Sequence, residues 1–314
     1  MNKILITGAN GQIGTELTVA LRERYGSNQV IGSDIKRPVA NHDHTFQVLD
    51  VLNKTAIQAL VQDEGITEIY HLAASLSAVA EKQPLRAWEL NMQGLLNVLD
   101  TAKIDQLKVF WPSSIAVFGD HAPKAFCSQH TITQPRTVYG ISKAAGENWC
   151  RYYYDNYGVD VRSIRYPGLI SHTAQPGGGT TDYAVEIFHQ AIKNRQYTCY
   201  LKPHTTLPMM YMADAVRATL ELMEAPSLGL TVRTSYNVAA MSFSPGELEA
   251  AIRKHLPAFR ADYRPDFRQT IADSWPTGIN DHQARHDWSW MPRYDLPDMV
   301  NDMLVRLRQE KDLR

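Results

Sequence analysis

The 314-residue chain contains only three cysteines, and no two of them form a Cys-x-x-Cys pair. Disulfide-stabilised secreted domains normally carry an even set of cysteines, so Cys127, Cys150 and Cys199 are expected to be buried and reduced. The eleven histidines form neither a His-Glu-x-x-His motif nor a cluster with cysteine. The sequence therefore predicts no metal site.

The chain also lacks an excess of charge and long apolar runs. Its 32 Lys and Arg residues balance 33 Asp and Glu residues, for a net charge of −1. No nucleic-acid partner is expected, because a phosphate-binding surface normally leaves a basic excess. No membrane partner is expected either, because the apolar runs are shorter than the roughly 18 residues that span a bilayer. Residues 3–7 already have the pattern of a buried strand, which leaves no room for a targeting peptide and favours the cytoplasm.

What the sequence does contain is an alternation of apolar strand-like runs with amphipathic helix-like stretches. Strands are expected at residues 3–7, 29–33, 68–72, 108–111 and 160–165, and helices at residues 13–25, 54–63, 85–102 and 138–156. This order is typical of βαβ units, which form a parallel sheet. The predicted fold class is α/β, a Rossmann-type doubly wound sheet whose ligand crevice lies at the carboxyl ends of the strands.

A glycine-rich turn, Gly8, Gly11 and Gly14, follows the first expected strand and opens the first expected helix. Glycines at such a turn allow the backbone to approach a pyrophosphate, which then lies at a helix N-terminus. Gln12 and Ile13 belong to the same turn and are expected to contact the cofactor. The spacing is Gly-x-x-Gly-x-x-Gly rather than Gly-x-Gly-x-x-Gly, so the turn alone is a weak signal.

Twenty residues beyond Gly14, the second expected strand ends at Asp34, which Ile35 and Lys36 follow. A carboxylate here accepts hydrogen bonds from ribose hydroxyls and repels a 2′-phosphate, which favours NAD. Lys36 and Arg37 leave NADP open as the alternative. The remaining residues expected to bind NAD lie after the third strand pattern and at the end of the 68–72 strand: Asp50, Val51, Leu72, Ala73 and Ala74.

The pattern of long alternating strands and helices ends after residue 167. Beyond it, a glycine run at 177–179 and frequent prolines divide the chain into shorter segments. Residues 1–166 are predicted to form the NAD-binding domain, joined by returns from the C-terminal half. Residues 167–314 are predicted to form mainly a smaller substrate-binding lobe.

Tyr139 and Lys143 are four residues apart on an expected helix, so their side chains share one face. A tyrosine has a pKa near ~10 and is a poor base at neutral pH. A neighbouring ammonium, together with the positive ring of oxidised NAD, is expected to lower that pKa. A surface pair on an amphipathic helix is the alternative interpretation of these two residues taken alone.

Two serines, Ser113 and Ser114, follow shortly after the strand expected at 108–111, at its carboxyl end. A hydroxyl at the carboxyl end of a parallel strand lies at the ligand crevice and can hydrogen-bond a substrate oxygen. Turn formation or helix capping is the alternative. The order of glycine turn, Asp34, serine, tyrosine and lysine favours a dehydrogenase over a regulator that senses NAD without catalysis.

With these motifs the sequence resembles the extended short-chain dehydrogenase/reductase superfamily over essentially its whole length. The resemblance implies that Ser114, Tyr139 and Lys143 are catalytic, with Tyr139 as general base and Lys143 also binding the nicotinamide ribose. It further implies that Asn91, which matches the structural asparagine of the family pattern, belongs with Tyr139, Tyr166 and Leu169 to the residues that bind NAD. Many members dimerise through the helices matching residues 85–102 and 138–157, so a homodimer is expected; Trp88, Leu95, Trp149 and Tyr153 suit that interface or a monomer core.

The C-terminal half narrows the resemblance to the L-threonine 3-dehydrogenases of this superfamily. The motifs that carry it are residues 165–171, 176–184, 207–215 and 275–276. The implied reaction oxidises the C3 hydroxyl of L-threonine to 2-amino-3-oxobutanoate, which a CoA ligase consumes or which decays to aminoacetone. The alternative is that the chain is a nucleotide-sugar 4-epimerase or dehydratase of the superfamily. Those enzymes usually carry Arg-Asp where this chain has Leu207-Pro208.

Threonine requires partners for its carboxylate, its ammonium and its methyl group. Backbone N–H groups around residues 178–181 can cradle the carboxylate, and Trp275 can close the pocket. The residues expected to bind the substrate are Ser75, Ser77, Ser114, Tyr139, Gly179, Thr180, Thr181 and Trp275. A flexible loop is the alternative for the glycine run, and simple packing is the alternative for Trp275.

Overall fold

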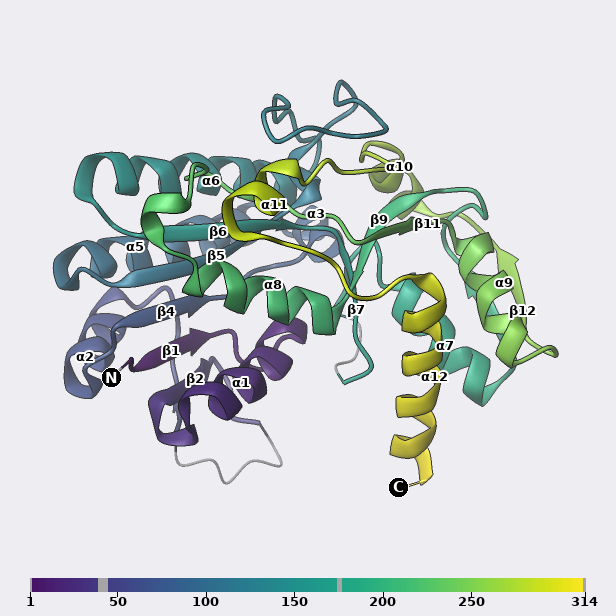
Figure 1. The fold of residues 1–314 in the computed structure, drawn as a ribbon, viewed down its shortest axis with the longest axis horizontal. Coiled ribbons are helices and arrows are strands. Elements are labelled where there is room, and N and C mark those ends of the chain that lie inside the picture. Colours follow the sequence, from purple (N-terminus) through teal and green to yellow (C-terminus); the bar gives the residue numbers. More distant parts are fainter. Residues whose placement is uncertain (1, 39–44, 174–176, 313–314) are drawn as a thin grey trace.

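The computed structural model describes residues 2–38, 45–173 and 177–312. A sheet with helices on both faces forms one part, and a smaller group of helices and short strands lies beyond one edge of it (Figure 1). The strands β7 (Gly168–Ile170) and β9 (Leu207–Tyr211) lie between the two parts, because β9 contributes Leu207, Met209 and Tyr211 to the apolar cluster of the smaller part and Met210 to a cluster of the main sheet.

Seven parallel strands form the main sheet in the order β10-β6-β5-β4-β1-β2-β3. From β1 the chain continues to β2 and β3 on one side of the sheet and then to β4, β5 and β6 on the other side. At such a switch point, between β1 and β4, a crevice opens at the carboxyl ends of the strands. The strands are β1 (Ile4–Thr7), β2 (Val30–Asp34), β3 (Phe46–Val48), β4 (Glu68–His71), β5 (Lys108–Ser114), β6 (Val161–Tyr166) and β10 (Tyr236–Asn237).

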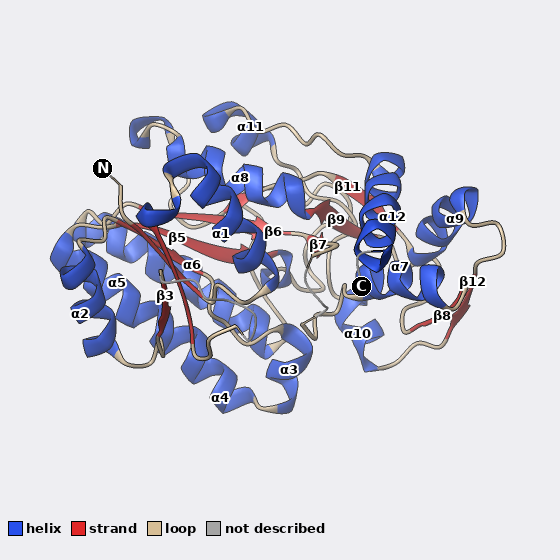
Figure 2. Cartoon of the chain, turned by 90° about the horizontal axis from the view of Figure 1, so that it is seen from below, coloured by secondary structure: helices blue, strands red, loops and turns tan. Residues whose placement is uncertain are grey.

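Helices cover both faces of this sheet, as Figure 2 shows with the strands between two rows of helices. One face buries an apolar cluster under α1 (Gln12–Tyr25) and α8 (Met212–Glu224). The other buries a cluster under α2 (Lys54–Glu64), α5 (Gly94–Asp105) and α6 (Val138–Tyr157). The predicted fold class, a doubly wound α/β sheet, is confirmed.

The helix expected at residues 85–102 is divided by a π-helical turn. The segment consists of α4 (Pro84–Trp88), the π turn Glu89–Gln93 and then α5. π turns occur frequently at functional sites because they redirect a side chain. Here the turn contains Asn91.

The smaller part has its own apolar core. Two short sheets, β11-β9-β7 and β12-β8, lie against helices of the C-terminal half.

The elements of the whole described chain that have not yet been given bounds are β8 (Gln196–Cys199), β11 (Met241–Phe243), β12 (Arg260–Tyr263), α3 (Ser77–Lys82), α7 (Tyr183–Lys193), α9 (Pro245–His255), α10 (Phe267–Asp273), α11 (His282–Trp288), α12 (Leu296–Asp312) and the 3₁₀ turns Ser27–Gln29, Ile115–Val117 and Ser227–Gly229.

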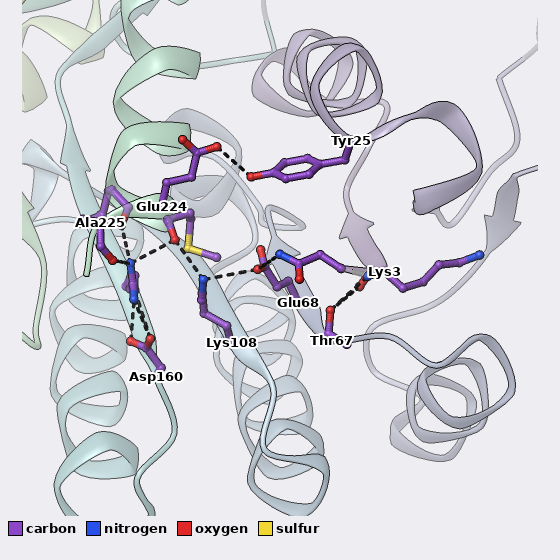
Figure 3. A network of polar contacts seen from close by, with 12 residues as sticks. Lys3, Tyr25, Thr67, Glu68, Lys108, Asp160, Glu224 and Ala225 are labelled. Carbon is purple, nitrogen blue, oxygen red and sulfur yellow. Dashed lines mark hydrogen bonds and ion pairs between the residues drawn. The ribbon is translucent and has the colours of Figure 1, made fainter. Parts of the chain in front are cut away.

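A polar network lies at the amino ends of the strands (Figure 3). Lys108 Nζ donates to Glu68 Oε1 at 3.3 Å and to the carbonyl of Met223 at 3.0 Å. Arg162, held by Asp160, donates to the carbonyls of Leu222, Met223 and Ala225 at the end of α8. These bonds satisfy carbonyls that a helix C-terminus leaves unpaired, so this edge of the sheet stabilises the fold.

All three cysteines are buried and free of disulfides, as expected. Within the described residues, no helix is long and apolar enough to cross a membrane. Across the same ranges, no group of three or more His, Cys, Asp or Glu side chains could hold a metal ion.

Candidate active site

The glycine turn lies between the carboxyl end of β1 and the N-terminus of α1. A Cβ atom built on Gly14 would lie 2.3 Å from the carbonyl oxygen of Gly8, so only glycine allows this close turn. Gly11 is the N-cap of α1, and no side chain among the described residues caps the free N–H groups of this helix. Within the same ranges the buried Nε2 of Gln12 has no hydrogen-bond partner either. Open N–H donors at a helix N-terminus fit a pyrophosphate, so these residues can hold a dinucleotide.

Asp34 ends β2 directly beside this turn. Its Oδ2 accepts a hydrogen bond from the Asn10 N–H at 3.2 Å, and its Oδ1 accepts one from the Ile35 N–H at 2.8 Å. Asn10 Nδ2 donates to the carbonyl of Lys36 at 2.7 Å, which fixes the loop after β2 against the turn. The Arg37 guanidinium donates to the carbonyl of Phe46 and lies over its ring.

Asn91 organises the loop after β4 rather than lining the cavity. Its Oδ1 accepts from the Ser75 N–H at 2.7 Å, and its Nδ2 donates to the Ser75 carbonyl and to Ser142 Oγ. The side chain is 4% exposed and its hydrogen-bonding groups are all engaged. Asn91 therefore connects the loop after β4 to α6 through the π turn.

Ser114 is the last residue of β5, which extends three residues beyond the strand expected at 108–111. Its Oγ accepts from the Ala116 N–H at 3.2 Å and also hydrogen-bonds Tyr139. Gly140 makes this meeting possible, because a Cβ atom there would lie 2.2 Å from the Ala116 carbonyl oxygen. A side chain at position 140 would therefore push the start of α6 away from Ser114.

Lys143 lies one turn after Tyr139 on α6 and is almost fully buried. Its Nζ donates to the carbonyl of Pro112 at 2.6 Å and lies 4.4 Å from the Trp111 ring and 5.5 Å from the Tyr139 ring. Burial lowers the pKa of Lys143 to about 7, against a raising effect of the Cys150 and Glu147 side chains. Lys143 is thus poised between charged and neutral forms near neutral pH.

Tyr139 differs from the expectation for its pKa. Burial raises the pKa of Tyr139 to about 12, and only the hydrogen bond from Ser114 lowers it. The expected lowering by Lys143 is not found in the free protein, because removal from water penalises the phenolate. A positive charge at the cavity is needed to reverse that penalty.

Glu147 continues the face of α6 that carries Tyr139 and Lys143. It forms a two-bonded ion pair with Arg165, at 2.8 and 2.7 Å, and accepts a hydrogen bond from Ser113 Oγ at 2.6 Å. Both charged side chains are about 5% exposed or less. Ser113 therefore connects β5 to α6, while its neighbour Ser114 lies at the cavity.

The glycine–threonine loop precedes α7; its residues 174–176, including Pro176 of the matched motif, lie outside the described residues. The Gly178 and Gly179 N–H groups both donate to Asp182 Oδ2 at 2.8 Å. These two donors are therefore not open to a substrate carboxylate, and the expected backbone cradle is wrong at this point. The hydroxyls of Ser77 and Thr180 lie 3.2 Å apart in the same region.

Most of the expected site residues line one cavity. Those lining it are Gly8, Gly11, Gln12, Ile13, Gly14, Leu72, Ala74, Ser77, Ser114, Tyr139, Lys143, Tyr166, Leu169, Gly179, Thr180, Thr181 and Trp275. The expected residues outside its lining are Asp34, Ile35, Lys36, Asp50, Val51, Ala73, Ser75 and Asn91. Val51 is buried against Gly94, and Ser75 is held by Asn91.

The sequence interpretation missed several lining residues. They are Leu76, Pro112, Ser113, Ile115, Pro167, Gly168 and Asp182. Most adjoin residues that were expected, so proximity in the chain was a usable signal. Asp182 had its own signal, since it follows directly on the Gly-Gly-Gly-Thr-Thr run.

Comparisons with known proteins agree with this geometry. Residues 4–239 match the family described as the NAD dependent epimerase/dehydratase family. An uncharacterized epimerase/dehydratase of Staphylococcus haemolyticus (strain JCSC1435) is 49% identical over 315 residues, covering 99% of each chain. Among solved structures, a GalE-like L-threonine dehydrogenase from Cupriavidus necator in its holo form is 56% identical with a TM-score of 0.95, covering 97% of this chain and 99% of that one. A monomeric L-threonine 3-dehydrogenase from a metagenome database is 48% identical with a TM-score of 0.96, covering 98% and 99%.

Proposed function

The chain belongs to the NAD dependent epimerase/dehydratase family, and from this premise we propose that it oxidises the C3 hydroxyl of L-threonine to a ketone with NAD. The observation that carries the proposal is a single cavity in which the glycine turn, the set Ser114, Tyr139 and Lys143, and a small polar loop meet. The product of this oxidation is 2-amino-3-oxobutanoate.

The reaction requires a base for the hydroxyl proton and a donor for the oxygen that becomes a carbonyl. NAD, when bound, supplies the acceptor for the hydride that leaves C3. Tyr139 as phenolate takes the hydroxyl proton, and the Ser114 hydroxyl donates a hydrogen bond to the reacting oxygen. Lys143, fixed by the Pro112 carbonyl, stabilises the phenolate through its charge and orients the nicotinamide ribose.

The alternative substrate, a nucleotide sugar, brings a diphosphate that needs a cation. Leu207 and Pro208 occupy the position at which such enzymes usually carry arginine, and both are buried in β9. An apolar pair there offers no partner for a diphosphate. The lack of a cation at these two positions favours a small amino acid as the substrate.

The test incubates the protein with NAD and L-threonine, and in parallel with UDP-galactose. Absorbance at the NADH band is expected to rise with threonine, and no 4-epimer of the sugar is expected. Sugar turnover without a threonine signal would refute the proposal.

Replacing Asp34 with serine is expected to weaken the preference for NAD over NADP. The carboxylate accepts hydrogen bonds from the ribose hydroxyls and repels a 2′-phosphate. Losing one such charge-assisted hydrogen bond costs ~1.5–3 kcal/mol, so kcat/KM for NAD should fall roughly 10- to 100-fold, while that for NADP rises. Steady-state kinetics with both cofactors measure the ratio; an unchanged ratio would show that Asp34 does not select the cofactor. The KM for threonine is the internal control, because Asp34 lies outside the cavity lining.

A homodimer through α4 and α6 is part of the proposal. Leu85, Trp88, Trp149 and Tyr152 on these helices are 39–84% exposed, which is unusual for large apolar side chains. Leu95 and Tyr153, by contrast, are buried in the monomer core. Light scattering is expected to give twice the chain mass of 35.5 kDa, whereas a single-chain mass would place this protein with its monomeric relative.

Two further proposals concern the cellular setting. We expect the enzyme to act in the cytoplasm. We also expect a CoA ligase to consume the unstable 3-oxo acid.

A further inference from the structure

We propose that Asp182 binds the ammonium group of the substrate and so selects 2-amino-3-hydroxy acids over 3-hydroxy acids. This inference rests on the proposed function, because it concerns the same cavity.

The two oxygens of Asp182 have different surroundings. Oδ2 accepts two hydrogen bonds, from the Gly178 and Gly179 N–H groups. Oδ1 accepts none from the residues that the structure describes. Asp182 is only 5% exposed, yet it lines the cavity. Oδ1 is not among the fully buried polar atoms that lack a partner, so it is accessible from the cavity and can accept a hydrogen bond from a donor that the cavity's occupant brings.

The charge of Asp182 is also unbalanced. It is the sole carboxylate among the lining residues, and it forms no ion pair within the described ranges. Arg268, whose charge acts on Asp182, pairs instead with Asp266 and lies over the Tyr200 ring. Burial raises the pKa of Asp182, and the two backbone hydrogen bonds oppose that effect. A cation at Oδ1 would hold the group ionised.

A purely local role as a helix cap does not explain this placement. Asp182 is the N-cap residue of α7, but its side chain accepts no hydrogen bond from the first turn of that helix. Its bonds instead run backwards to residues 178 and 179. The carboxylate is thus held rigidly by the loop, with one oxygen committed and one available.

Three contacts then define an amino acid in the cavity. Ser114 and Tyr139 meet the C3 hydroxyl. Asp182 meets the ammonium on C2. The hydroxyls of Ser77 and Thr180, 3.2 Å apart, lie among the lining residues and can donate to the substrate carboxylate. Three separate contacts around adjacent carbons distinguish threonine from a hydroxy acid that lacks the amino group.

The test is Asp182→Asn, which removes the charge but keeps an oxygen that can accept from Gly178 and Gly179. Truncating one partner of a buried charge pair should lower kcat/KM for L-threonine by at least about 30-fold. The loss should appear mainly in KM, because the ammonium does not change during the reaction. The inhibition constant of 3-hydroxybutanoate, which has no ammonium, should stay the same or fall.

Glu186→Gln is the matched control, since it removes a carboxylate from the same helix outside the cavity. Glu186 accepts a hydrogen bond from the Tyr197 hydroxyl at 2.8 Å, and its loss should leave both constants within about threefold. If Asp182→Asn weakens threonine and 3-hydroxybutanoate equally, or neither, the proposal is wrong.

Calorimetric titration of the NAD complex with threonine separates this inference from the proposed function. Wild-type protein that binds threonine without oxidising it would refute the function alone. A binding preference for threonine over 3-hydroxybutanoate that persists in Asp182→Asn would refute the inference alone. Wild-type protein that neither binds nor oxidises threonine would refute both.

Discussion

Tyr139→Phe is expected to lower kcat for threonine oxidation by about 10²- to 10⁴-fold. The substitution removes only the hydroxyl that takes the proton, and it leaves the ring beside Lys143. Because the substitution leaves the glycine turn and Lys143 unchanged, NADH binding measured by fluorescence should change little. Turnover close to that of the wild type would show that another group is the base.

The pH dependence provides an independent check on the same residue. The pKa of Lys143 is lowered to about 7 and that of Tyr139 is raised to about 12 by burial. The proton lost near pH 7 is therefore that of Lys143, whereas Tyr139 keeps its proton in the free protein. Because the base must lose its own proton before it can accept one, and burial holds the pKa of Tyr139 at about 12, kcat/KM should rise as the pH rises above neutral. In Tyr139→Phe this rise should vanish; a rise that persists would assign it elsewhere.

Glu147→Gln is expected to lower the free energy of unfolding by about 3–5 kcal/mol, since it leaves the buried Arg165 charge without its partner. Arg165 would keep only neutral acceptors, namely the remaining amide oxygen at position 147, the Gln129 carbonyl at 3.0 Å and Asn237 Oδ1 at 3.1 Å. Urea-induced unfolding measures the change. Asp155→Asn on the same helix is the control, because its pair with Arg151 is exposed and worth only ~0–1 kcal/mol.

The double variant Glu147→Gln with Arg165→Met tests the reason for that loss. Removing both charges eliminates the unpaired guanidinium, so the double variant should lose less stability than the sum of the two single variants. Strict additivity would mean that the ion pair itself contributes nothing. Glu147 also raises the pKa of Lys143, so Glu147→Gln should lower that pKa and leave less of Lys143 charged at neutral pH.

The sequence alone was sufficient for the alternation of strands and helices along the chain and for many of the residues that meet at the carboxyl edge of the sheet. Strands such as β1 and β6 begin or end within one residue of their expected limits. The reason is physical: strands buried on both faces are continuous apolar runs, and parallel connections bring their carboxyl ends to one edge. That rule and helical spacing bring Ser113, Ser114, Tyr139 and Lys143 to this edge, and the resemblance to the family then selects Ser114 over Ser113.

Only the tertiary structure decided where charges and donors are satisfied. It showed that burial raises the pKa of Tyr139, that Asn91 is committed to the loop after β4, and that Glu147 pairs with Arg165. It also showed that the N–H groups of Gly178 and Gly179, which were expected to bind the substrate carboxylate, donate instead to Asp182 Oδ2. Spacing along a chain cannot reveal these partners, because desolvation and hydrogen bonding depend on which distant segments exclude water around a group.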